Sequence, residues 1–549
     1  MQCWSDNFMP DDNAKLKQLL SYLKVNISSI GPRKRTHADK LTLDSRLADA
    51  STLFLAIFGS QSSGHQYVDK AAKNGCELAF LDTTEQHQHG NVEERCIGEK
   101  LAITCVFVHD LHSKLADIAY CFYTGTHGQN QSTSELPTIT AITGTNGKTS
   151  VAALMAQLSS LCQQPCASIG TLGVNLFASG KQQKLADTIN TTPDIISLIG
   201  TLALLQSKGC KSAVLEASSH GLAQNRLSKL NVDCAVFTNL TQDHLDYHGS
   251  MQSYSHAKRQ LLLAQGLNKV VLNADDNESL QWQRDAHCDQ EVYWFSLNEL
   301  ALEKKGCWAS DISYSTKGIS FTLHAKFLSF EAEKKISAPL IGMFNVANLI
   351  AALTALLAQG LPFEALVEAT QKISGVAGRM ELFSSHKASV LVDYAHTPDA
   401  LKQALQAARV HTEGTLTCIF GCGGNRDKSK RAIMGGIAQK YADNIVLTQD
   451  NSRNEDLTSI IADIRTGIDT LANHQTLTVV LDREQAISRT WQMSNSSDMI
   501  LVAGKGHEDY IEINDRRIAY NERDVVRVLT KSHVSNTGTV HLTHSGGQQ

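Results

Sequence analysis

The residues whose types and spacing most clearly indicate chemistry form one glycine-rich run. Its members are Gly144, Thr145, Asn146, Gly147, Lys148 and Thr149. Residues 140–143 predict the end of a strand, and residues 150–155 predict the start of a helix. A glycine-rich turn between a strand and a helix directs backbone N–H groups and the positive helix end towards an anion. We therefore predict an ATP-phosphate turn, in which Lys148 reaches terminal phosphates and the Thr149 hydroxyl ligates Mg²⁺.

This run departs from the strict pattern G-x-x-x-x-G-K-[ST], because Ile142 stands where the first glycine belongs. Taken alone, the run is also compatible with a plain glycine turn that begins a helix. A choice between the two interpretations has to come from the rest of the chain.

Six predicted strands run directly into polar clusters that carry glycine, histidine or charged residues. These clusters are residues 216–221, 238–244, 393–396, 421–428, 450–453 and 504–508. Ligands of open α/β sheets bind beyond the carboxyl ends of the strands, where these clusters would project. Capping and turn formation would explain one or two such clusters, but not six. The pattern therefore predicts an extended ligand-binding edge.

The elements that position these clusters alternate between short apolar strands and helical patterns. Predicted strands include residues 52–57, 78–81, 213–215, 234–237, 269–272, 390–392, 416–420, 444–447 and 499–502. This alternation predicts an α/β fold with mostly parallel sheets and helices on both faces. The length of 549 residues exceeds what one hydrophobic core usually organises, which favours three domains.

Breaks in the pattern suggest where the domains end. A polar linker at residues 128–137 and a second break at residues 374–378 divide the chain into residues 1–132, 133–377 and 378–531. Residues 532–549 are rich in Ser, Thr, Gly and Gln without periodicity, which predicts a disordered tail.

Composition excludes several classes of function. The formal net charge of -5 gives no general attraction to nucleic acid or to an anionic membrane. No apolar run approaches a membrane span, and the first residues show no secretory signal. The 13 cysteines are scattered without C-x-x-C pairs, which favours reduced thiols over a zinc site. We expect a cytoplasmic protein.

With these clusters in place, the chain resembles the Mur ligase family, the ATP-dependent amino-acid ligases of peptidoglycan synthesis. The resemblance extends from about residue 43 to about residue 526, through several motifs in a fixed order. It implies a small α/β domain that binds a UDP sugar, a central P-loop-type ATPase and a C-terminal Rossmann-like domain that binds the amino acid. It also implies a monomer.

The resemblance is strongest to members of the family that add diaminopimelate. It implies three substrates: ATP, UDP-N-acetylmuramoyl-L-alanyl-D-glutamate and meso-2,6-diaminopimelate. Amide formation needs a carboxylate made reactive, which ATP supplies through an acyl phosphate that the amine then attacks. Phosphoryl transfer of this kind depends on positioning and on neutralisation of charge.

A second metal site is implied around Lys258, which lies on a predicted helix and matches the carbamylated lysine of the family. A lysine reacts with CO₂ as the neutral amine, which burial or cationic neighbours favour by lowering its pKa. The resulting carbamate would bind a second Mg²⁺ together with Glu216 and His244. Without the resemblance, Lys258 would be taken for a solvated helix lysine.

His244 and His248 could also form a zinc pair, but they lack the Glu of H-E-x-x-H and are predicted to lie in a loop.

Contacts with the UDP-muramoyl dipeptide and the nucleotide are likewise implied by the resemblance. The dipeptide substrate would contact Ser45, Ser60, Gln61, Ser62, Asn190, Thr191, Thr192, Ser218, Gln224 and Arg226. Residues 60–62 differ from the sequence that is usual at this place in the family. The nucleotide would contact Asn345, Asn348, Arg379 and Asp393 in addition to the glycine-rich turn. Asparagine suits the mixed donor and acceptor edge of adenine, and arginine offers a rigid fork for carboxylate or phosphate.

The amino acid would be selected by a third group of residues. They are Arg426, Asp450, Asn451, Ser452, Arg453, Gly504 and Glu508. Diaminopimelate carries a second carboxylate and ammonium at its far end; the arginines can bind the carboxylate, and Asp450 and Glu508 the ammonium. Ser452 stands where relatives usually have proline, which removes a rigid turn residue.

Three alternatives stay open from the sequence. The chain could be a sister ligase that adds L-lysine, or a folate-type polyglutamyl ligase with the same ATPase core. It could also be a non-catalytic nucleotide-binding relative. The segments 450–453 and 44–46 argue against the first two. Lys148, Glu216, His244 and Lys258 argue against the third, because a binder does not need two metal sites.

Overall fold

The computed structural model describes residues 14–26, 38–59, 62–98, 101–125, 136–241, 243–301, 303–472, 475–514 and 516–531. They form two compact units. One holds the amino-terminal sheet and the part of the central sheet before residue 270; the other holds the rest of the central sheet and the carboxyl-terminal sheet. The three domain boundaries inferred above remain predictions. The predicted tail and most of the predicted linker lie outside the described residues.

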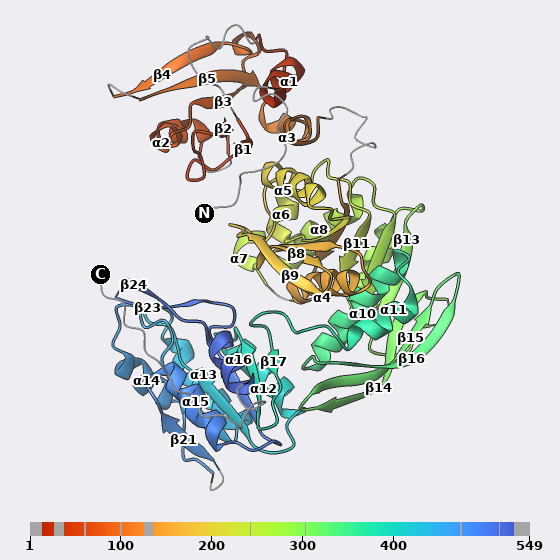
Figure 1. The fold of residues 1–549 in the computed structure, drawn as a ribbon, viewed down its shortest axis with the longest axis vertical. Helices are drawn as coiled ribbons and strands as arrows, with labels where there is room; N and C mark the ends of the chain where they lie inside the picture. Colours follow the sequence, from red (N-terminus) through yellow and green to blue (C-terminus); the bar gives the residue numbers. More distant parts are fainter. Residues whose placement is uncertain are drawn as a thin grey trace, which may run out of the picture. The chain divides into compact units, whose positions relative to one another are not determined.

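The amino-terminal sheet has the strand order β1-β2-β3-β5-β4, and only β4 runs antiparallel to its neighbour (Figure 1). Its strands are β1 Lys40–Thr42, β2 Thr52–Ala56, β3 Leu78–Thr83, β4 Val92–Ile97 and β5 Leu101–His109; its helices are α1 Ala14–Tyr22, α2 Val68–Lys73 and α3 Leu115–Thr124. The apolar face of α2 packs on Phe54, Ala79 and Cys105, which lie on β2, β3 and β5. This buried face stabilises the sheet.

The central sheet has eleven strands in the order β16-β15-β14-β13-β12-β11-β6-β10-β7-β8-β9. The strands are β6 Thr138–Thr143, β7 Cys166–Gly170, β8 Gly173–Ala178, β9 Lys181–Ala186, β10 Ser212–Glu216, β11 Cys234–Phe237, β12 Lys269–Asn273, β13 Glu291–Ser296, β14 Gly306–Ser315, β15 Gly318–Lys326 and β16 Glu331–Ala338. Strands β6, β7, β10 and β11 are parallel, whereas β8 and β9 beside β7, and β15 and β16 beside β14, are antiparallel additions at the two ends. Of these four parallel strands, β6, β10 and β11 were predicted and β7 was not.

The helices of the central region are α4 Lys148–Leu161, α5 Ile195–Ser207, α6 Ser219–Ala223, α7 Leu245–His248, α8 Met251–Arg259, α9 Asn277–Asp285, α10 Met343–Ala358 and α11 Phe363–Thr370. Of these helices, α4 follows β6, α6 follows β10, and α7 and α8 follow β11, the strands whose ends carry predicted site residues. Helix α10 is apolar along most of its length and is buried against β14, and α11 packs on β16.

The carboxyl-terminal sheet has the order β17-β18-β22-β19-β20-β21 and is parallel apart from β17. The elements are β17 Glu381–Phe383, β18 Ser389–Asp393, α12 Pro398–Arg409, β19 Leu416–Phe420, α13 Ser429–Tyr441, β20 Asn444–Leu447, α14 Leu457–Arg465, β21 Thr476–Val479, α15 Arg483–Met493, β22 Met499–Ala503 and α16 Glu522–Lys531, with a separate hairpin of β23 Tyr510–Ile513 and β24 Arg516–Ala519.

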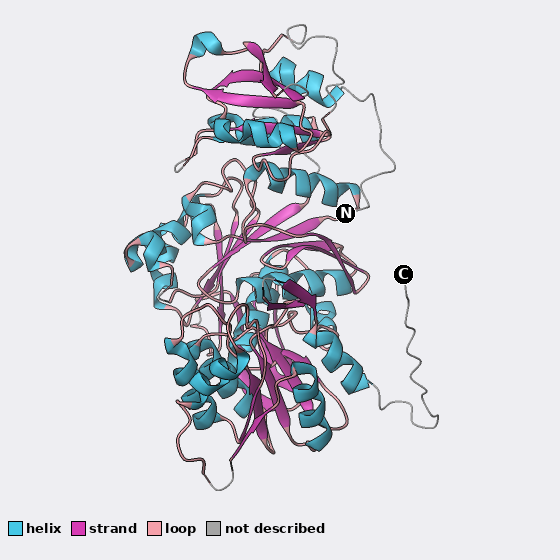
Figure 2. Cartoon of the chain, turned by 90° about the vertical axis from the view of Figure 1, so that its left-hand side faces the viewer, coloured by secondary structure: helices cyan, strands magenta, loops and turns pink. Residues whose placement is uncertain are grey.

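Both faces of this sheet are covered by helices (Figure 2). On β18, Leu391 packs among residues of α12 to α14, whereas Val390 and Val392 pack among residues of α15 and α16. Successive residues of a strand point to opposite faces, so a continuous apolar run is what a strand buried on both sides requires. The α/β class and the predicted strand-end clusters are confirmed.

None of the helices within the described ranges is long and apolar enough to span a bilayer.

Candidate active site

The glycine-rich run forms a tight turn between β6 and α4, and α4 begins at Lys148. Gly144 has φ +146, and a Cβ there would lie 1.9 Å from Thr238 Oγ1. The turn is also tied to the segment after β11: the Thr145 and Asn146 amides donate to the Asn239 carbonyl (2.8 Å) and Asn239 Oδ1 (2.9 Å). The close approach of two strand-end segments explains why glycine is required at position 144.

Lys148 lies over the turn that precedes it. Its Nζ donates to the carbonyl oxygens of Gly144 (2.8 Å) and Thr145 (2.9 Å). Thr149 follows in the first turn of α4, where backbone N–H groups have no partners within the helix. The structure therefore places Lys148 and Thr149 at the amino-terminal end of α4, next to the glycine-rich turn; their roles towards phosphate and Mg²⁺ stay predictions.

Lys258 lies on α8, as predicted, and its side chain is buried. Its Nζ donates to the Gly144 carbonyl at 2.7 Å and lies 4.4 Å from the ring centroid of Tyr254. Burial, and then the charge of Lys148, lower the pKa of Lys258 to about 6. At neutral pH the amine is therefore largely uncharged and nucleophilic.

Glu216 ends β10 and is almost completely buried. Its carboxylate accepts hydrogen bonds from the Thr171 amide (2.8 Å to Oε1) and the Thr171 hydroxyl (3.2 Å to Oε2). A Cβ at Gly170 would lie 2.0 Å from Glu216 Oε1, so the absence of a side chain at position 170 leaves room for the carboxylate. Sequence reasoning missed Gly170 and Thr171, because β7, which ends at Gly170, was not predicted as a strand.

His244 lies just before α7 with φ 51, in the left-handed region. Its Nε2 is 3.4 Å from Asp243 Oδ2, and its ring packs edge-on against His220, with centroids 4.9 Å apart. His248, which was predicted to lie in a loop, instead closes the single helical turn of α7, and its Nε2 contacts Ser219 Oγ at 3.0 Å. The loop prediction was wrong because four residues with no strong helix periodicity give no pattern to detect.

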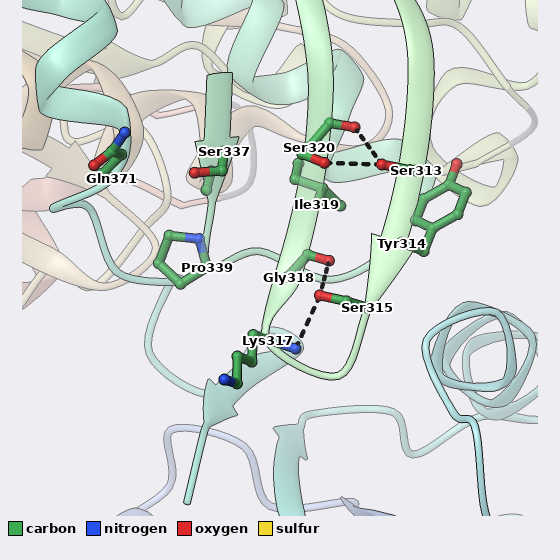
Figure 3. Close-up of a pocket in the computed structure, with 11 residues that line it drawn as sticks. Ser313, Tyr314, Ser315, Lys317, Gly318, Ile319, Ser320, Ser337, Pro339 and Gln371 are labelled. Carbon is green, nitrogen blue, oxygen red and sulfur yellow. Dashed lines mark hydrogen bonds between the residues drawn. The ribbon is translucent and has the colours of Figure 1, made fainter. Parts of the chain in front are cut away.

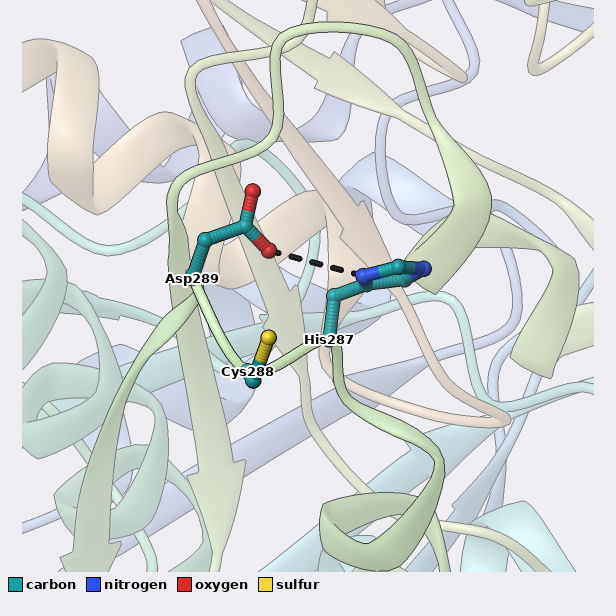
Figure 4. Close-up of side chains that lie close together, drawn as sticks. All are labelled: His287, Cys288 and Asp289. Atoms are coloured by element: carbon teal, nitrogen blue, oxygen red, sulfur yellow. Dashed lines mark ion pairs between the residues drawn. The ribbon is translucent and has the colours of Figure 1, made fainter.

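Within the described ranges, one group of three His, Cys, Asp or Glu side chains lies close enough together to share an ion, and it is not the predicted metal site. It consists of the consecutive exposed residues His287, Cys288 and Asp289 (Figure 4). His287 Nδ1 and Asp289 Oδ1 are 3.5 Å apart. This exposed turn carries none of the predicted site residues.

Four of the predicted dipeptide-binding residues form one hydrogen-bonded network with Glu216. The buried Thr192 hydroxyl donates to the Glu216 carbonyl (2.8 Å) and accepts from the Ser218 amide (2.9 Å). Arg226 donates to the Thr192 carbonyl (2.6 Å) and to Gln224 Oε1 (2.7 and 3.1 Å). The proposed metal ligand and the proposed substrate residues are therefore held by the same contacts.

The remaining predicted dipeptide residues are placed separately. Asn190 and Thr191 directly precede Thr192, and the Thr191 hydroxyl is 3.2 Å from that of Thr171. Ser45 is buried in the turn between β1 and β2, where its carbonyl accepts from Asn74 Nδ2 at 2.9 Å. Ser62 is exposed, and Ser60 and Gln61 lie outside the described residues.

The predicted adenine residues lie in the first turns of α10. Asn345 Nδ2 donates to the Ile341 carbonyl (2.9 Å), and Asn348 Nδ2 donates to Asn345 Oδ1 (3.1 Å). Both side chains are buried and are thereby held in defined orientations.

Arg379 and Asp393 lie in the carboxyl-terminal region. The Asp393 carboxylate accepts from the amides of Met380 (2.7 Å) and Ala395 (2.8 Å), while burial raises its pKa above the ordinary value. The Arg379 guanidinium lies 5.0 Å from the ring centroid of Tyr394. Asp393 therefore holds the loop that carries Arg379.

The amino-acid residues gather at the carboxyl ends of β20 and β22. Asp450, Asn451 and Ser452 are buried, and Asn451 Nδ2 donates to Glu508 Oε2 at 3.0 Å. Gly504 has φ +119, and a Cβ there would lie 2.5 Å from Asp450 Oδ2. The structure therefore brings four of the predicted residues, Asp450, Asn451, Gly504 and Glu508, to one place.

The two arginines of this group differ in environment. Arg453 pairs with Glu512 (3.1 Å from Nε to Oε2), and its Nη1 donates to the Gly424 carbonyl at 2.9 Å. Arg426 is exposed. Ser452 is buried and lies close to Gly424, since a Cβ at Gly424 would lie 1.9 Å from the Ser452 carbonyl oxygen.

Sequence reasoning missed Lys505 and Glu512, which contact this group directly. Lys505 lies inside the predicted cluster 504–508, but its type was not assigned a role. Glu512 lies on β23, in a hairpin that no motif marked.

A pocket of about 340 Å³ lies elsewhere, at the turn between β14 and β15 (Figure 3). Its lining includes four serines, Tyr314, Lys317 and Gln371, and contains none of the predicted site residues.

The chain matches the Mur ligase middle domain over residues 142–356 and the Mur ligase glutamate ligase domain over residues 378–506. These matches, together with the relatives described next, place the chain in the Mur ligase family, a class of ATP-dependent ligases.

Similar curated proteins carry one name, UDP-N-acetylmuramoyl-L-alanyl-D-glutamate--2,6-diaminopimelate ligase. The protein from Vibrio vulnificus (strain YJ016) is 39% identical over 490 residues, which cover 89% of this chain and 94% of the relative. That from Haemophilus influenzae (strain PittGG) is 38% identical, with 88% and 94% covered. A solved structure with the same name has a TM-score of 0.65 at 31% identity and covers 93% of this chain and 100% of that one.

Solved structures with lower identity share the fold. MurF from Acinetobacter baumannii has a TM-score of 0.62 at 17% identity and covers 94% of this chain and 98% of that one. At this identity the likeness concerns the architecture alone.

Proposed function

We propose that this chain joins meso-2,6-diaminopimelate to the D-glutamate carboxylate of UDP-N-acetylmuramoyl-L-alanyl-D-glutamate, with ATP as the energy source. One observation carries the choice of amino acid: Arg453 and Glu508 lie at the carboxyl ends of β20 and β22, tied to one network through Asn451 and Glu512. A guanidinium and a carboxylate on neighbouring segments suit a far end that carries one carboxylate and one ammonium. The curated relatives with this name support the assignment.

Phosphorylation of the substrate carboxylate would take place at the turn before α4. Lys148 and the α4 end would neutralise charge on the transferring phosphoryl group, and Arg379 would contact the nucleotide. Asn345 and Asn348, held by the hydrogen bonds described above, would receive the adenine edge. The resulting acyl phosphate is then attacked by the amine of diaminopimelate.

The donors present suit two Mg²⁺ ions. Thr149 would hold one; Glu216, His244 and a CO₂-derived carbamate on Lys258 would hold the other. Bound Mg²⁺ supplies charge neutralisation and alignment of phosphate oxygens. The fit rests on the chemistry of the donors, because a buried carboxylate and a largely neutral buried amine are the groups that such a carbamate site requires.

Arg226 and its neighbours would bind the dipeptide substrate from the network around Thr192, and Ser45, with Ser60 to Ser62, would contact the nucleotide sugar. In this proposal residues 1–132, 133–377 and 378–531 are the UDP-sugar, ATPase and amino-acid domains of a cytoplasmic monomer that binds neither nucleic acid nor a membrane.

The test is ADP release with the UDP-muramoyl dipeptide and either meso-diaminopimelate or L-lysine. Rapid release with meso-diaminopimelate, together with formation of the tripeptide product by mass spectrometry, is expected. Faster turnover with L-lysine would favour the lysine-adding alternative, and release with neither would favour a non-catalytic relative.

A further inference from the structure

The proposed ammonium pocket already contains a positive charge of the chain itself. Lys505 Nζ donates to Glu508 Oε2 and Asn451 Oδ1, both at 2.9 Å, and lies 3.7 Å from Asp450 Oδ1. Its side chain is fully buried, whereas those of Asp450 and Glu508 are 9% and 18% exposed. The lysine ammonium therefore lies innermost, and Glu508 is the carboxylate nearest to solvent.

The contacts of the two carboxylates differ accordingly. Asp450 Oδ1 accepts from the Asn451 amide at 2.6 Å and faces Lys505, and its Oδ2 packs against Gly504. On Glu508, Oε2 receives both Lys505 and Asn451 Nδ2. Both contacts of the Glu508 carboxylate thus use Oε2, which leaves Oε1 for a ligand.

The net charge of this group also leaves room for one ammonium of a ligand. Asp450, Glu508 and Lys505 together carry one net negative charge, which matches one ammonium. The adjacent pairs Arg453–Glu512 and Arg483–Glu522 are each balanced, so they do not alter this charge. A second free carboxylate would instead draw an ammonium deeper into the pocket, since two unpaired buried like charges attract a cation strongly.

We propose that Lys505 is a specificity-determining positioning residue, which occupies the inner anionic position and confines the ammonium of the substrate to the outer oxygen of Glu508. Asp450 then acts through Lys505 and does not contact the substrate. The inference rests on the proposed function, and it narrows the earlier expectation that Asp450 and Glu508 share the ammonium.

The experiment compares meso-diaminopimelate with 2-aminopimelate, which keeps the far carboxylate but lacks the far ammonium. In the wild type, a kcat/KM preference for meso-diaminopimelate is expected. Glu508→Gln should reduce this preference about tenfold or more, because it removes the charged acceptor. Asp450→Asn leaves Lys505 and Glu508 as a neutral pair, so it should reduce the preference too, but clearly less than Glu508→Gln does, because the substrate ammonium keeps its direct contact with Glu508. Equal loss of preference in the two variants would overturn the proposal.

Lys505→Met tests the positioning role itself. With the inner position uncharged, the substrate ammonium is drawn inward and its reacting amine is set back. We expect kcat with meso-diaminopimelate to fall about tenfold without a rise in its KM, and kcat with 2-aminopimelate to change less than about threefold. Lys505→Arg should retain more of the kcat with meso-diaminopimelate. An equal fall for both amino acids, or a raised KM for ATP, would indicate a merely structural role and contradict the proposal.

Arg409→Met is the matched control. It removes an ion pair with Asp443 (2.8 Å) before β20, at the opposite end of the strands, and should leave the preference unchanged. If Lys505→Met does not fold, the contrast between Asp450→Asn and Glu508→Gln still decides. Wild-type protein that releases no ADP with meso-diaminopimelate would refute the proposed function itself, which is a separate outcome.

Discussion

Lys258 combines complete burial with a cationic neighbour, and both features favour its neutral form. This matters for the proposed carbamate, because CO₂ reacts with an amine and not with an ammonium. The residue types at the turn and on α8 were predictable from sequence, as were burial and a cationic neighbour as general causes of a low lysine pKa. That the neighbour is Lys148 was not predictable, since it depends on the β6–α4 turn and α8 meeting in space.

Replacement of Lys258 tests the carbamate directly. We expect Lys258→Ala to reduce ligation to below about 1% of the wild-type rate, because an anionic metal ligand is lost. Added formate or acetate should restore part of the rate by supplying carboxylate oxygens. The measurement is ADP release across a formate titration.

Arg259→Ala is the control, since Arg259 is the next residue on α8 and pairs with Asp285 at 3.0 Å. It should keep nearly full activity without formate. Full activity of Lys258→Ala would rule out the carbamate.

Arg453 should affect the amino acid far more than the nucleotide. We expect Arg453→Ala to raise the KM for meso-diaminopimelate about tenfold or more, because a charge-assisted hydrogen bond is lost. The KM for ATP should change less than about threefold, and initial-rate kinetics measure both. Equal increases in the two KM values would remove Arg453 from the recognition of the far carboxylate.

At the scale of elements, the site is made where strands end. Strand ends such as those of β10, β11 and β20 could be predicted within one or two residues, because parallel strands buried on both faces read as apolar runs. The antiparallel additions β7-β8-β9 and β14-β15-β16, the turn of α7 and the role of Lys505 could not. They depend on pairings and contacts between segments that no local pattern encodes.

The turn between β6 and α4 makes a sharp prediction about glycine. Gly144→Ala would place a Cβ 1.9 Å from Thr238 Oγ1 and 3.1 Å from the Asn239 backbone at φ +146. We expect a loss of stability of roughly 1–3 kcal/mol and the loss of ATP binding, because the turn must open. Thermal unfolding and an ATP titration measure the two effects.

Gly209→Ala is the matched control for position 144. Gly209 has φ +75, and no atom lies within 4 Å of an added Cβ. It should cost about 1 kcal/mol and leave ATP binding intact. Equal ATP affinity in both variants would show that the geometry of Gly144 is unimportant for the nucleotide.

At the scale of the whole molecule, His411 joins segments far apart in sequence. Its Nε2 accepts from the Gly342 amide (2.9 Å), which precedes α10, and its Nδ1 donates to the Ser315 carbonyl (2.8 Å) at the end of β14. Both contacts require a neutral ring with the proton on Nδ1. Burial lowers the pKa of His411 below its ordinary value.

This arrangement predicts a dependence of stability on pH. Since the folded pKa is below the unfolded value of 6.5, the full contribution is present above pH 6.5 and is lost as the pH falls. His411→Gln can keep both hydrogen bonds but does not titrate. Between pH 7.5 and pH 5.5 we expect the Tm of this variant to fall less than that of the wild type. The difference should be about 2–4 °C for each kcal/mol of unfolding free energy that the wild type loses through His411.

The exposed His287→Gln serves as the control, and its Tm should follow the wild type. An identical pH dependence of His411→Gln and wild type would show that His411 contributes nothing to acid sensitivity.

The buried amine of Lys258 lowers the thermal stability of the protein, although the proposed reaction requires it. Between pH 6 and pH 10.5, folding has to remove a proton that the unfolded chain keeps. In CO₂-depleted buffer at pH 7, Lys258→Met should therefore raise the free energy of unfolding by roughly 1–4 kcal/mol and unfold at a higher temperature than the wild type. The gain should shrink towards pH 10. A laboratory selection for thermal tolerance alone would thus favour losing this lysine, so any thermostable variant of the protein has to be selected for turnover at the same time.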